Sequence, residues 1–241
     1  HSTQRRQSMT LSLDPSLGLP QVCLIDDEEV VRDALAWLLR SRRLLSEGFA
    51  SADAFEAWLA QQAAPWPGAP ACLVLDVRMP GTSGLVLFER LAERGLLQLL
   101  PVILLTGHGD VPTAVATVKR GAFDFVEKPF SNNGLVDRVE EALALSARAI
   151  QARRGKDQLQ RALATLEMGI SEVKDDIPLR VEYGNRLRAD GRIAESIAAY
   201  RQLVGIYPAN AEGWRGLVSA YVDRGRMGEA GLALAPLCVL G

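Results

Sequence analysis

The sequence predicts an α/β domain with a doubly wound, five-stranded parallel sheet, followed by a C-terminal all-α region of helical repeats. Two observations predict this fold. Between residues 20 and 131, short apolar runs alternate with amphipathic stretches, as in successive βαβ units. From Ser131 onward the pattern is helical throughout, and its last part contains two related segments in tandem. We therefore expect two structured regions of different architecture.

Composition narrows the class of protein. The chain has 241 residues, 48% hydrophobic and 23% charged, with a net charge of -2. This balance gives no electrostatic argument for a nucleic-acid or membrane surface, and the apolar runs are far shorter than the ~20 residues of a membrane span. Residues 1–19 are expected to be a tag and a disordered N-terminus without a signal peptide. Cys23, Cys72 and Cys238 predict buried thiols in a reducing cytoplasm, so a cytoplasmic location is expected.

Five strands are expected in the region of residues 20–131. The third is apolar on both faces, as a sheet covered on both sides requires. The strands are predicted at Gln21–Ile25, Leu45–Phe49, Ala71–Val77, Pro101–Thr106 and Asp124–Glu127. The amphipathic stretches between them predict helices at Glu28–Arg40, Ala52–Gln62, Leu85–Arg94 and Val111–Arg120.

A helical linker is expected at residues 132–174. Apolar residues at helical spacing predict one helix at 132–153 and another at 157–170. Gly155 lies between them and costs a continuous helix only about 1 kcal/mol. The sequence therefore leaves open whether the linker is one helix or two.

Residues 175–241 contain two related segments. Asp190-Gly-Arg-Ile-Ala-Glu-Ser and Arg224-Gly-Arg-Met-Gly-Glu-Ala share one pattern at an offset of 34. This period resembles the tetratricopeptide repeat, a pair of antiparallel helices, and chance coincidence is the minor alternative. The resemblance implies a surface that binds a peptide or helix of another protein. We expect the apolar end, Leu232–Gly241, to pack on the helix at 157–170 or on a second subunit, unless the chain continues.

Charged and polar residues stand at the carboxyl ends of the predicted strands, where open α/β sheets bind ligands. Asp26 and Asp27 follow the first strand, Asp76 lies in the third, Thr106 ends the fourth and Lys128 follows the fifth. Crowded carboxylates repel by about 4 kcal/mol per pair, so this cluster predicts a bound cation or raised pKa values. Oxygen ligands with open positions suit Mg²⁺ or Mn²⁺. Helix capping alone would explain Asp26 and Asp27, but it would not explain why Asp76, Thr106 and Lys128 stand at the ends of the other strands.

These residues lie in stretches that resemble the receiver domain of two-component response regulators. The matching stretches are Ile25-Asp26-Asp27-Glu28, Leu75-Asp76-Val77-Arg78-Met79-Pro80-Gly81 with Gly84, Leu105-Thr106-Gly107-His108-Gly109-Asp110 and Glu127-Lys128-Pro129-Phe130. The resemblance covers residues 20–131 and implies a flavodoxin-like receiver fold.

The resemblance also implies the metal site and the phosphate acceptor. Asp76 is the implied acceptor, taking a phosphoryl group from a sensor histidine kinase. The implied Mg²⁺ or Mn²⁺ ligands are Asp26, Asp27, Asp76 and the backbone carbonyl of Arg78.

The remaining implied residues contact the phosphoryl group or respond to it. Thr106 and Lys128 would touch its oxygens, which makes them, with Asp76, the catalytic set. Phe125 occupies the position of a switching aromatic. Because phenylalanine lacks a hydroxyl, any switch there is one of packing alone.

Three functions compete. The favoured one is a response regulator of a phosphorelay that signals through protein-binding repeats. Such a receiver modifies itself and is no turnover enzyme on external substrates. The second is a DNA-binding transcriptional regulator, which we expect less because residues 175–241 carry eight acidic and eight basic residues. The third is a pseudo-receiver scaffold that is never phosphorylated. The expected partners are the kinase, an unidentified protein at the repeats and a second copy of the chain as a further candidate, without a membrane.

Overall fold

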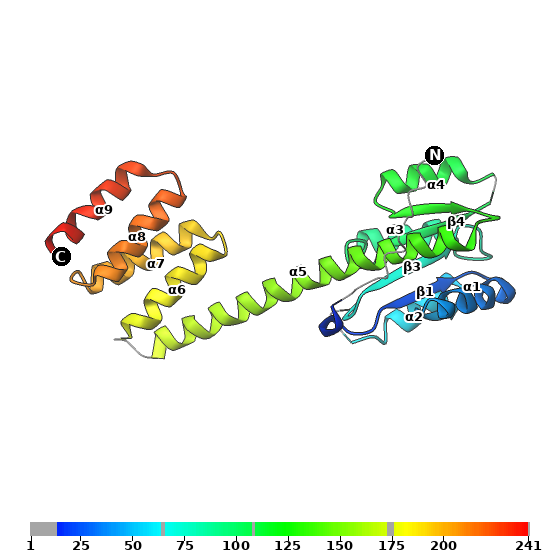
Figure 1. The fold of residues 1–241 in the computed structure, drawn as a ribbon, viewed down its shortest axis with the longest axis horizontal. Coiled ribbons are helices and arrows are strands. Elements are labelled where there is room, and N and C mark those ends of the chain that lie inside the picture. Colours follow the sequence, from blue (N-terminus) through cyan, green and yellow to red (C-terminus); the bar gives the residue numbers. More distant parts are fainter. Residues whose placement is uncertain (1–13, 64–65, 108, 173–175, 241) are drawn as a thin grey trace, which may run out of the picture. The chain divides into compact units, whose positions relative to one another are not determined.

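The computed structural model describes residues 14–63, 66–107, 109–172 and 176–240. The chain divides into two compact units, His1–Arg153 and Arg154–Gly241, and each has its own core (Figure 1). Across the described segments, every helix is too short or too polar to cross a membrane.

The first unit contains the predicted five-stranded parallel sheet. Its strands run in the order β2-β1-β3-β4-β5, and every neighbouring pair is parallel. The bounds are β1 Gln21–Ile25, β2 Leu45–Phe49, β3 Ala71–Asp76, β4 Val102–Thr106 and β5 Asp124–Glu127. They match the predicted strands to within one residue at each end, because a run that is buried on both faces is visible in the sequence.

Helices cover both faces of this sheet. The bounds are α1 Glu29–Ser41, α2 Ala52–Leu59, α3 Gly84–Glu93 and α4 Val111–Lys119. Side chains of α2, α3 and α4 pack on one face, while α1 and the first part of the next helix pack on the other. Strand β3 contributes Leu73 and Leu75 to the first core and Cys72 and Val74 to the second. The doubly wound α/β fold predicted from the sequence is therefore confirmed.

A single helix, α5 Asn132–Glu172, occupies the predicted linker, which resolves the alternative between one helix and two. The boundary between the units falls within it, after Arg153. Ser146 anchors its first part, because its Oγ donates a hydrogen bond to the Leu99 carbonyl at 2.6 Å and accepts one from the Ala71 amide at 3.0 Å. These contacts hold α5 at the end of the sheet opposite the strand ends that carry the charged residues.

The expected disordered N-terminus lies largely outside the described residues. Its last part differs from the expectation, since Pro15–Leu17 form a short 3-10 helix. Leu17 is buried against Ala147 and Ile150 of α5. Leu17 lies between Pro15 and Gly18, outside any helical or strand-like run, so only its tertiary contact shows that it is buried.

The second unit holds two helical hairpins that repeat at the predicted interval. Its helices are α6 Ile177–Ala189, α7 Ile193–Ile206, α8 Ala211–Asp223 and α9 Met227–Leu240. Each bound of α8 and α9 lies at the predicted offset from the matching bound of α6 or α7. Gly191 and Gly225 occupy equivalent turns with φ values of 74° and 72°, a conformation that favours glycine. The C-terminal region is therefore all-α, as predicted.

Tyr200 is the centre of the second core. It is fully buried, and its hydroxyl lies 2.6 Å from Oδ1 of Asn185. A Cβ added at Gly184 would lie 2.7 Å from the ring, and one added at Gly216 would lie 2.2 Å from it. The ring therefore fits between helices α6 and α8 only because both positions are glycine.

The cysteines differ from the expectation at one position. Cys23 and Cys72 are buried in β1 and β3, and burial raises the pKa of the Cys23 thiol to about 12. Cys238, expected to be buried, is exposed. The reason is that α9 buries only the side carrying Ala230 and Ala233. In the described residues, the helix at 157–170 does not cover the apolar end either, since Leu232 is 77% and Val239 is 86% exposed.

Candidate functional site

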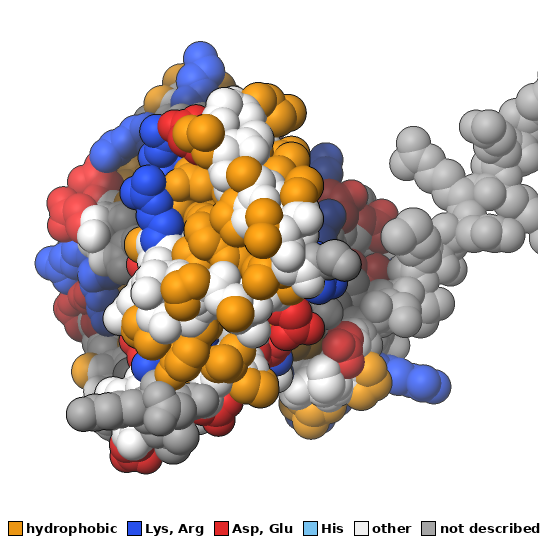
Figure 2. All heavy atoms as spheres, turned by 90° about the vertical axis from the view of Figure 1, so that its left-hand side faces the viewer, with side chains coloured by type: hydrophobic (Ala, Val, Ile, Leu, Met, Phe, Trp, Pro, Cys, Tyr) orange, Lys and Arg blue, Asp and Glu red, His pale blue; other side chains and the backbone are white. Residues whose placement is uncertain are grey.

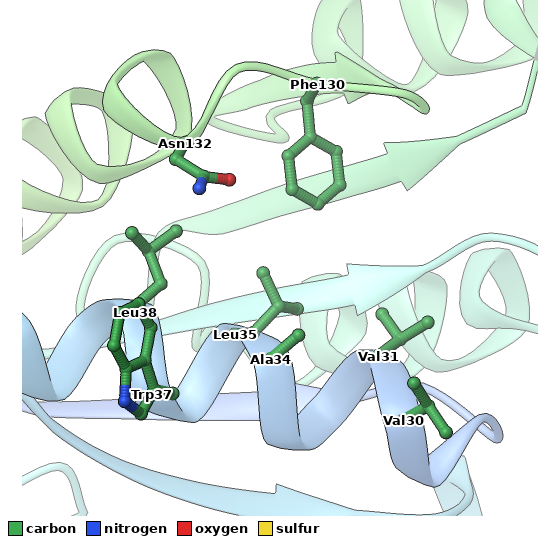
Figure 3. Close-up of a pocket in the computed structure, with 8 residues that line it drawn as sticks. All are labelled: Val30, Val31, Ala34, Leu35, Trp37, Leu38, Phe130 and Asn132. Carbon is green, nitrogen blue, oxygen red and sulfur yellow. The ribbon is translucent and has the colours of Figure 1, made fainter.

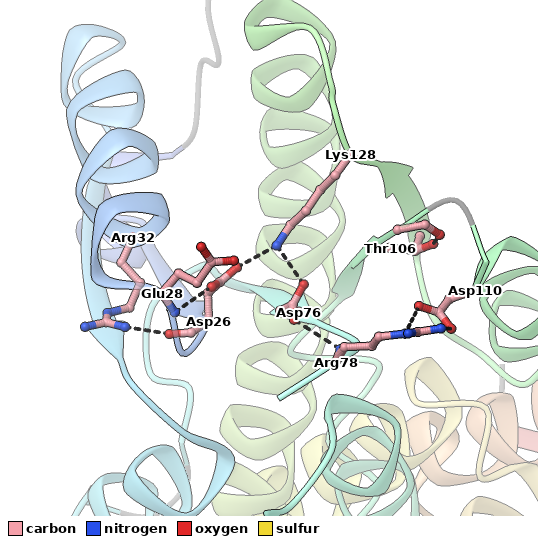
Figure 4. Close-up of polar contacts among 9 residues, drawn as sticks. Asp26, Glu28, Arg32, Asp76, Arg78, Thr106, Asp110 and Lys128 are labelled. Atoms are coloured by element: carbon pink, nitrogen blue, oxygen red, sulfur yellow. Dashed lines mark hydrogen bonds and ion pairs between the residues drawn. The ribbon is translucent and has the colours of Figure 1, made fainter. Parts of the chain in front are cut away.

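The predicted site residues lie at the carboxyl ends of four strands, along one edge of the sheet (Figure 4). Asp26 follows β1, Asp76 ends β3, Thr106 ends β4 and Lys128 follows β5. The strand register places Asp76 beside Leu105, next to Thr106. The Lys128 amide donates to the Thr106 carbonyl at 2.8 Å, so the last two strand ends are tied together.

One ammonium group bridges two buried carboxylates. Nζ of Lys128 lies 2.9 Å from Oδ2 of Asp26 and 2.8 Å from Oδ1 of Asp76. Asp26 is 1% exposed and Asp76 is 6% exposed. Because a buried charge is costly unless it is paired, this contact explains how both aspartates can lie inside the domain. The three groups together carry one negative charge, which a cation could balance.

The pKa values of Asp76 and Lys128 reflect the burial of both side chains and their attraction to each other. Burial raises the pKa of Asp76, the bonds to Lys128 offset part of that rise, and the charge of Asp26 adds to it. For Lys128, burial alone would lower the pKa, but the hydrogen bonds to Asp76 and Asp26 outweigh it and the pKa is raised. The ammonium is therefore held in its charged form, facing a carboxylate that is costly to ionise.

Two local features position Asp76. The Arg78 amide donates to its Oδ2 at 3.1 Å, which fixes the side chain at the strand end. A Cβ added at Gly84, the first residue of α3, would lie 2.0 Å from the Asp76 carbonyl oxygen. Only glycine allows α3 to begin this close to the end of β3, which gives the glycine of the sequence motif a physical reason.

Asp26 and Asp27 differ in their environment. Oδ1 of Asp26 accepts a hydrogen bond from the Glu28 amide at 2.9 Å, as in a capping turn. Its Oδ2 binds Lys128, so capping alone does not account for it. Asp27 is exposed, and its carbonyl accepts from Nη1 of Arg32 at 3.0 Å. The two adjacent acids therefore have separate roles in the turn.

Thr106 lies at the end of β4, whereas Phe125 lies within β5 opposite Leu104, and neither is joined to the ion pairs. The Thr106 hydroxyl is buried and donates to the Gly107 carbonyl at 2.9 Å. Phe125 is half-buried and packs on the core beneath α2, α3 and α4. His108, part of the motif, lies outside the described residues.

The side chain of Arg78 makes a contact that the sequence did not predict. Its Nε lies 2.5 Å from Oδ2 of Asp110, and its Nη2 lies 2.8 Å from Oδ1. This bidentate ion pair links the loop after β3 to the start of α4. The hydrogen bond from Arg78 lowers the pKa of Asp110. Asp110 belongs to the motif Leu105–Asp110, but the sequence gives no sign that it pairs with Arg78. Only their proximity in the folded chain shows this contact.

The carboxylate and carbonyl oxygens at this site are the kind of ligand that Mg²⁺ prefers. Across the described segments, no group of three or more His, Cys, Asp or Glu side chains is arranged to hold a metal ion. Mg²⁺ does not need such a group, because it keeps several waters and binds through one or two carboxylates. Asp26 and Asp76 can supply these. The Arg78 carbonyl and the exposed Asp27 follow them within two residues along the chain.

An apolar groove of about 420 Å³ begins beside the site (Figure 3). It lies between α1 and the segment that enters α5, and Val30 and Trp37 on its border are 80% and 74% exposed. Phe130, two residues after Lys128, lines its other side. Its lining is completed by Val31, Ala34, Leu35, Leu38 and Asn132.

The first unit is similar in sequence to known proteins. Residues 22–140 match the response regulator receiver domain. The C4-dicarboxylate transport transcriptional regulatory protein DctR of Rhodobacter capsulatus is 44% identical over 144 residues, 59% of this chain and 68% of DctR. The transcriptional regulatory protein TdiR of Thauera aromatica is 40% identical over 156 residues, 65% of each chain.

Two further matches extend beyond the first unit. The transcriptional regulatory protein FixJ of Azorhizobium caulinodans is 36% identical over 189 residues, 78% of this chain and 82% of FixJ. A solved structure of the response regulator StyR has 31% identity and a TM-score of 0.58, and the match covers 88% of this chain and 91% of StyR. The chain therefore belongs to the two-component response regulators, with a receiver domain in its first unit.

Proposed function

We propose that Asp76 accepts a phosphoryl group from the phosphohistidine of a sensor histidine kinase, in a reaction that requires Mg²⁺ or Mn²⁺. The observation that carries this proposal is the bridge from Lys128 to Asp76 and Asp26. A carboxylate oxygen of Asp76 forms a P–O bond, the P–N bond of the donor breaks, and the leaving imidazole nitrogen takes a proton. The receiver contributes positioning and charge neutralisation to this transfer.

Each site residue has a role in the proposal. Lys128 neutralises charge on the phosphoryl oxygens, and the Thr106 hydroxyl turns from the Gly107 carbonyl to bind one of them. Asp26, Asp27, Asp76 and the Arg78 carbonyl would hold the metal ion, which supplies further charge neutralisation. Phe125 moves by repacking once Thr106 has turned. The chain modifies itself in this way and is not a turnover enzyme on external substrates.

The groove beside α1 is the surface on which we place the kinase. A protein donor must bring its phosphohistidine to Asp76, so its surface has to rest on residues next to the strand ends. The groove starts there, and its border exposes Trp37 and Val30. Large exposed apolar side chains of this kind are typical of protein-binding sites.

The output of the second unit has two candidates. The first is a protein-binding surface of tetratricopeptide-like repeats, supported by hairpins that recur at the offset seen in the sequence and by equivalent glycine turns at Gly191 and Gly225. The second is regulation of transcription at a DNA site, supported by the names of DctR, TdiR and FixJ. The balanced charge of residues 175–241 favours the first, but the relatives give no support to the expectation that DNA is not a partner.

The test of the acceptor is phosphorylation by acetyl phosphate with Mg²⁺. We expect covalent label on the unmodified chain and its loss in Asp76→Asn. The matched control is Asp33→Asn, which removes an exposed carboxylate from α1 and should keep the label. Equal labelling of Asp76→Asn would refute the proposal, and absence of label on the unmodified chain would favour the pseudo-receiver alternative.

Two further measurements separate the partners. Trp37→Ala should slow transfer from a phosphorylated kinase about tenfold, the effect of losing an interface anchor worth roughly 1.4 kcal/mol, while labelling by acetyl phosphate stays unchanged. Equal slowing with both donors would place Trp37 in the chemistry instead. Binding of the full chain to genomic DNA fragments at low salt, measured with and without acetyl phosphate, decides whether the second output candidate stands.

A further inference from the structure

The second helices of the two hairpins are buried to different extents. In α7, Tyr200 is 0% and Val204 is 6% exposed, because α8 covers them. Their equivalents in α9, at the same repeat offset, are Leu234 and Cys238. Leu234 is 47% exposed and Cys238 is also exposed. The surface of α7 that α8 covers therefore has an equivalent on α9, and on α9 this surface is exposed.

The contact between α7 and α8 shows which side chains pack against this kind of surface. The covering helix, α8, approaches through glycines: a Cβ at Gly216 would lie 2.2 Å from the Tyr200 ring. A Cβ at Gly213 would lie 3.0 Å from the side chains of Leu203 and Val204. Bulky side chains from one helix thus meet glycines of the next, antiparallel helix.

Helix α9 carries both kinds of residue on one exposed stripe. Positions three and four residues apart share a side of a helix, and these positions form the surface that we name the α9 face: Met227, Gly228, Gly231, Leu234, Ala235 and Cys238. A Cβ added at Gly228 or Gly231 would meet nothing within 4 Å. The glycines therefore lie in the first half of this face, and Leu234 and Cys238 lie in its second half.

The α9 face is also free of charge. The single charged residue of α9, Glu229, lies off this face and pairs with Arg226 at 2.5 Å. In the space-filling view, hydrophobic side chains gather over the side of the second unit that includes α9 (Figure 2). Two such faces can meet without bringing like charges together, whereas a charged peptide would find no opposite charge here.

We propose that the α9 face binds the α9 face of a second copy of this chain, with the two helices antiparallel. A two-fold interface requires a surface that is complementary to itself. The α9 face meets this requirement, because Leu234 and Cys238 of one copy can lie over Gly228 and Gly231 of the other. The pair of α9 helices reproduces the α7–α8 contact between two chains. This proposal is independent of the chemistry at Asp76.

The test is the mass in solution of the full chain carrying Asp76→Asn, which excludes association driven by phosphorylation. Sedimentation equilibrium from about 1 µM to about 100 µM, a range that covers moderate affinities, should show a shift from one chain to two. Leu234→Glu places a charge on the face twice in each dimer and should raise the dissociation constant at least about 100-fold. Ile206→Glu is the control, since Ile206 is 50% exposed on α7, and it should leave association unchanged.

Cross-linking provides a second readout. Cys23 and Cys72 are buried and Cys238 is exposed. The proposed pairing sets the two Cys238 residues about ten positions, or about 15 Å, apart along the helix axis, so a bis-maleimide with a spacer of about that length should join two chains through Cys238. The cross-linked species should be absent in Cys238→Ser and in Leu234→Glu. Circular dichroism checks that Leu234→Glu keeps its helices. A single-chain mass throughout, with free labelling of Cys238 by a simple maleimide, would overturn the proposal and leave the face to another protein or to a further segment of a longer chain. Association that Leu234→Glu leaves intact would overturn it as well.

Discussion

The two units of this chain bury polar groups in different ways. The receiver unit encloses charges: Asp26 and Asp76 are almost fully buried, and Lys128 bridges them. In the described part of the second unit, the buried polar side chain is Ser196, a neutral group that donates to the Gly184 carbonyl at 2.8 Å. Buried charges reduce stability unless their pairing is excellent. Their presence in the first unit fits the chemistry that we propose at Asp76.

Several charged residues of the second unit lie instead in solvent-accessible ion pairs between positions three or four residues apart. Arg186 pairs with Glu182 at 2.7 Å, and Arg192 pairs with Glu195 at 2.5 Å. Exposed pairs of this kind contribute about 0–1 kcal/mol to stability. Leaving buried charges without their partner should therefore lower stability strongly in the first unit, whereas removing an exposed charge should change it weakly in the second. The following substitutions test this contrast.

The largest effect is expected for Lys128→Met. It leaves two buried carboxylates facing each other without a cation, which should lower the free energy of unfolding at pH 7 by about 3–5 kcal/mol. The loss should shrink as the pH falls and the carboxylates take up protons. Urea unfolding of the full chain at pH 7 and pH 5 measures both effects, with Lys119→Met on the exposed side of α4 as the control. Equal losses at the two pH values would contradict the assignment.

A smaller effect is expected in the second unit from Gly216→Ala. The added Cβ would overlap the Tyr200 ring, and such overpacking costs about 1–3 kcal/mol. Thermal unfolding followed by circular dichroism should show the loss. Labelling of Asp76 by acetyl phosphate should not change. Glu182→Gln, which removes one side of an exposed pair, should leave stability nearly unaltered, and a comparable loss in that variant would erase the contrast between the units.

The smallest effect is expected for the stability of Asp76→Asn, and it has the opposite sign. Because the pKa of Asp76 is raised in the folded chain, the folded state binds a proton more tightly than the unfolded state. Ionisation at pH 7 therefore destabilises the fold, and the neutral amide should raise the free energy of unfolding by less than the loss expected for Gly216→Ala. The gain should be full above the folded pKa and vanish as the pH falls below the usual value of 3.8. Urea unfolding across this pH range measures whether the variant is more or less stable than the unmodified chain. A less stable variant at pH 7 would show that the attraction between Asp76 and Lys128 exceeds the cost of burying the Asp76 charge.

The sequence alone determined the sheet and the location of the site. Strands buried on both faces, such as β3, appear as continuous apolar runs, and parallel strands bring Asp26, Asp76, Thr106 and Lys128 to one edge. The interval between the hairpins was equally visible, because each hairpin repeats its turn glycine and its helical spacing.

Tertiary structure decided what local patterns cannot encode. The continuity of α5 across Gly155 could not be decided from a helix cost of about 1 kcal/mol, and the structure shows one helix through that exposed position. The exposure of Cys238 depends on α9 being covered on one side only, and the pairing of Arg78 with Asp110 joins residues 32 positions apart. A sequence pattern specifies the period of an element and the side that it buries. Which side chain meets which depends on distances in space between elements, and these exist only once the chain has folded.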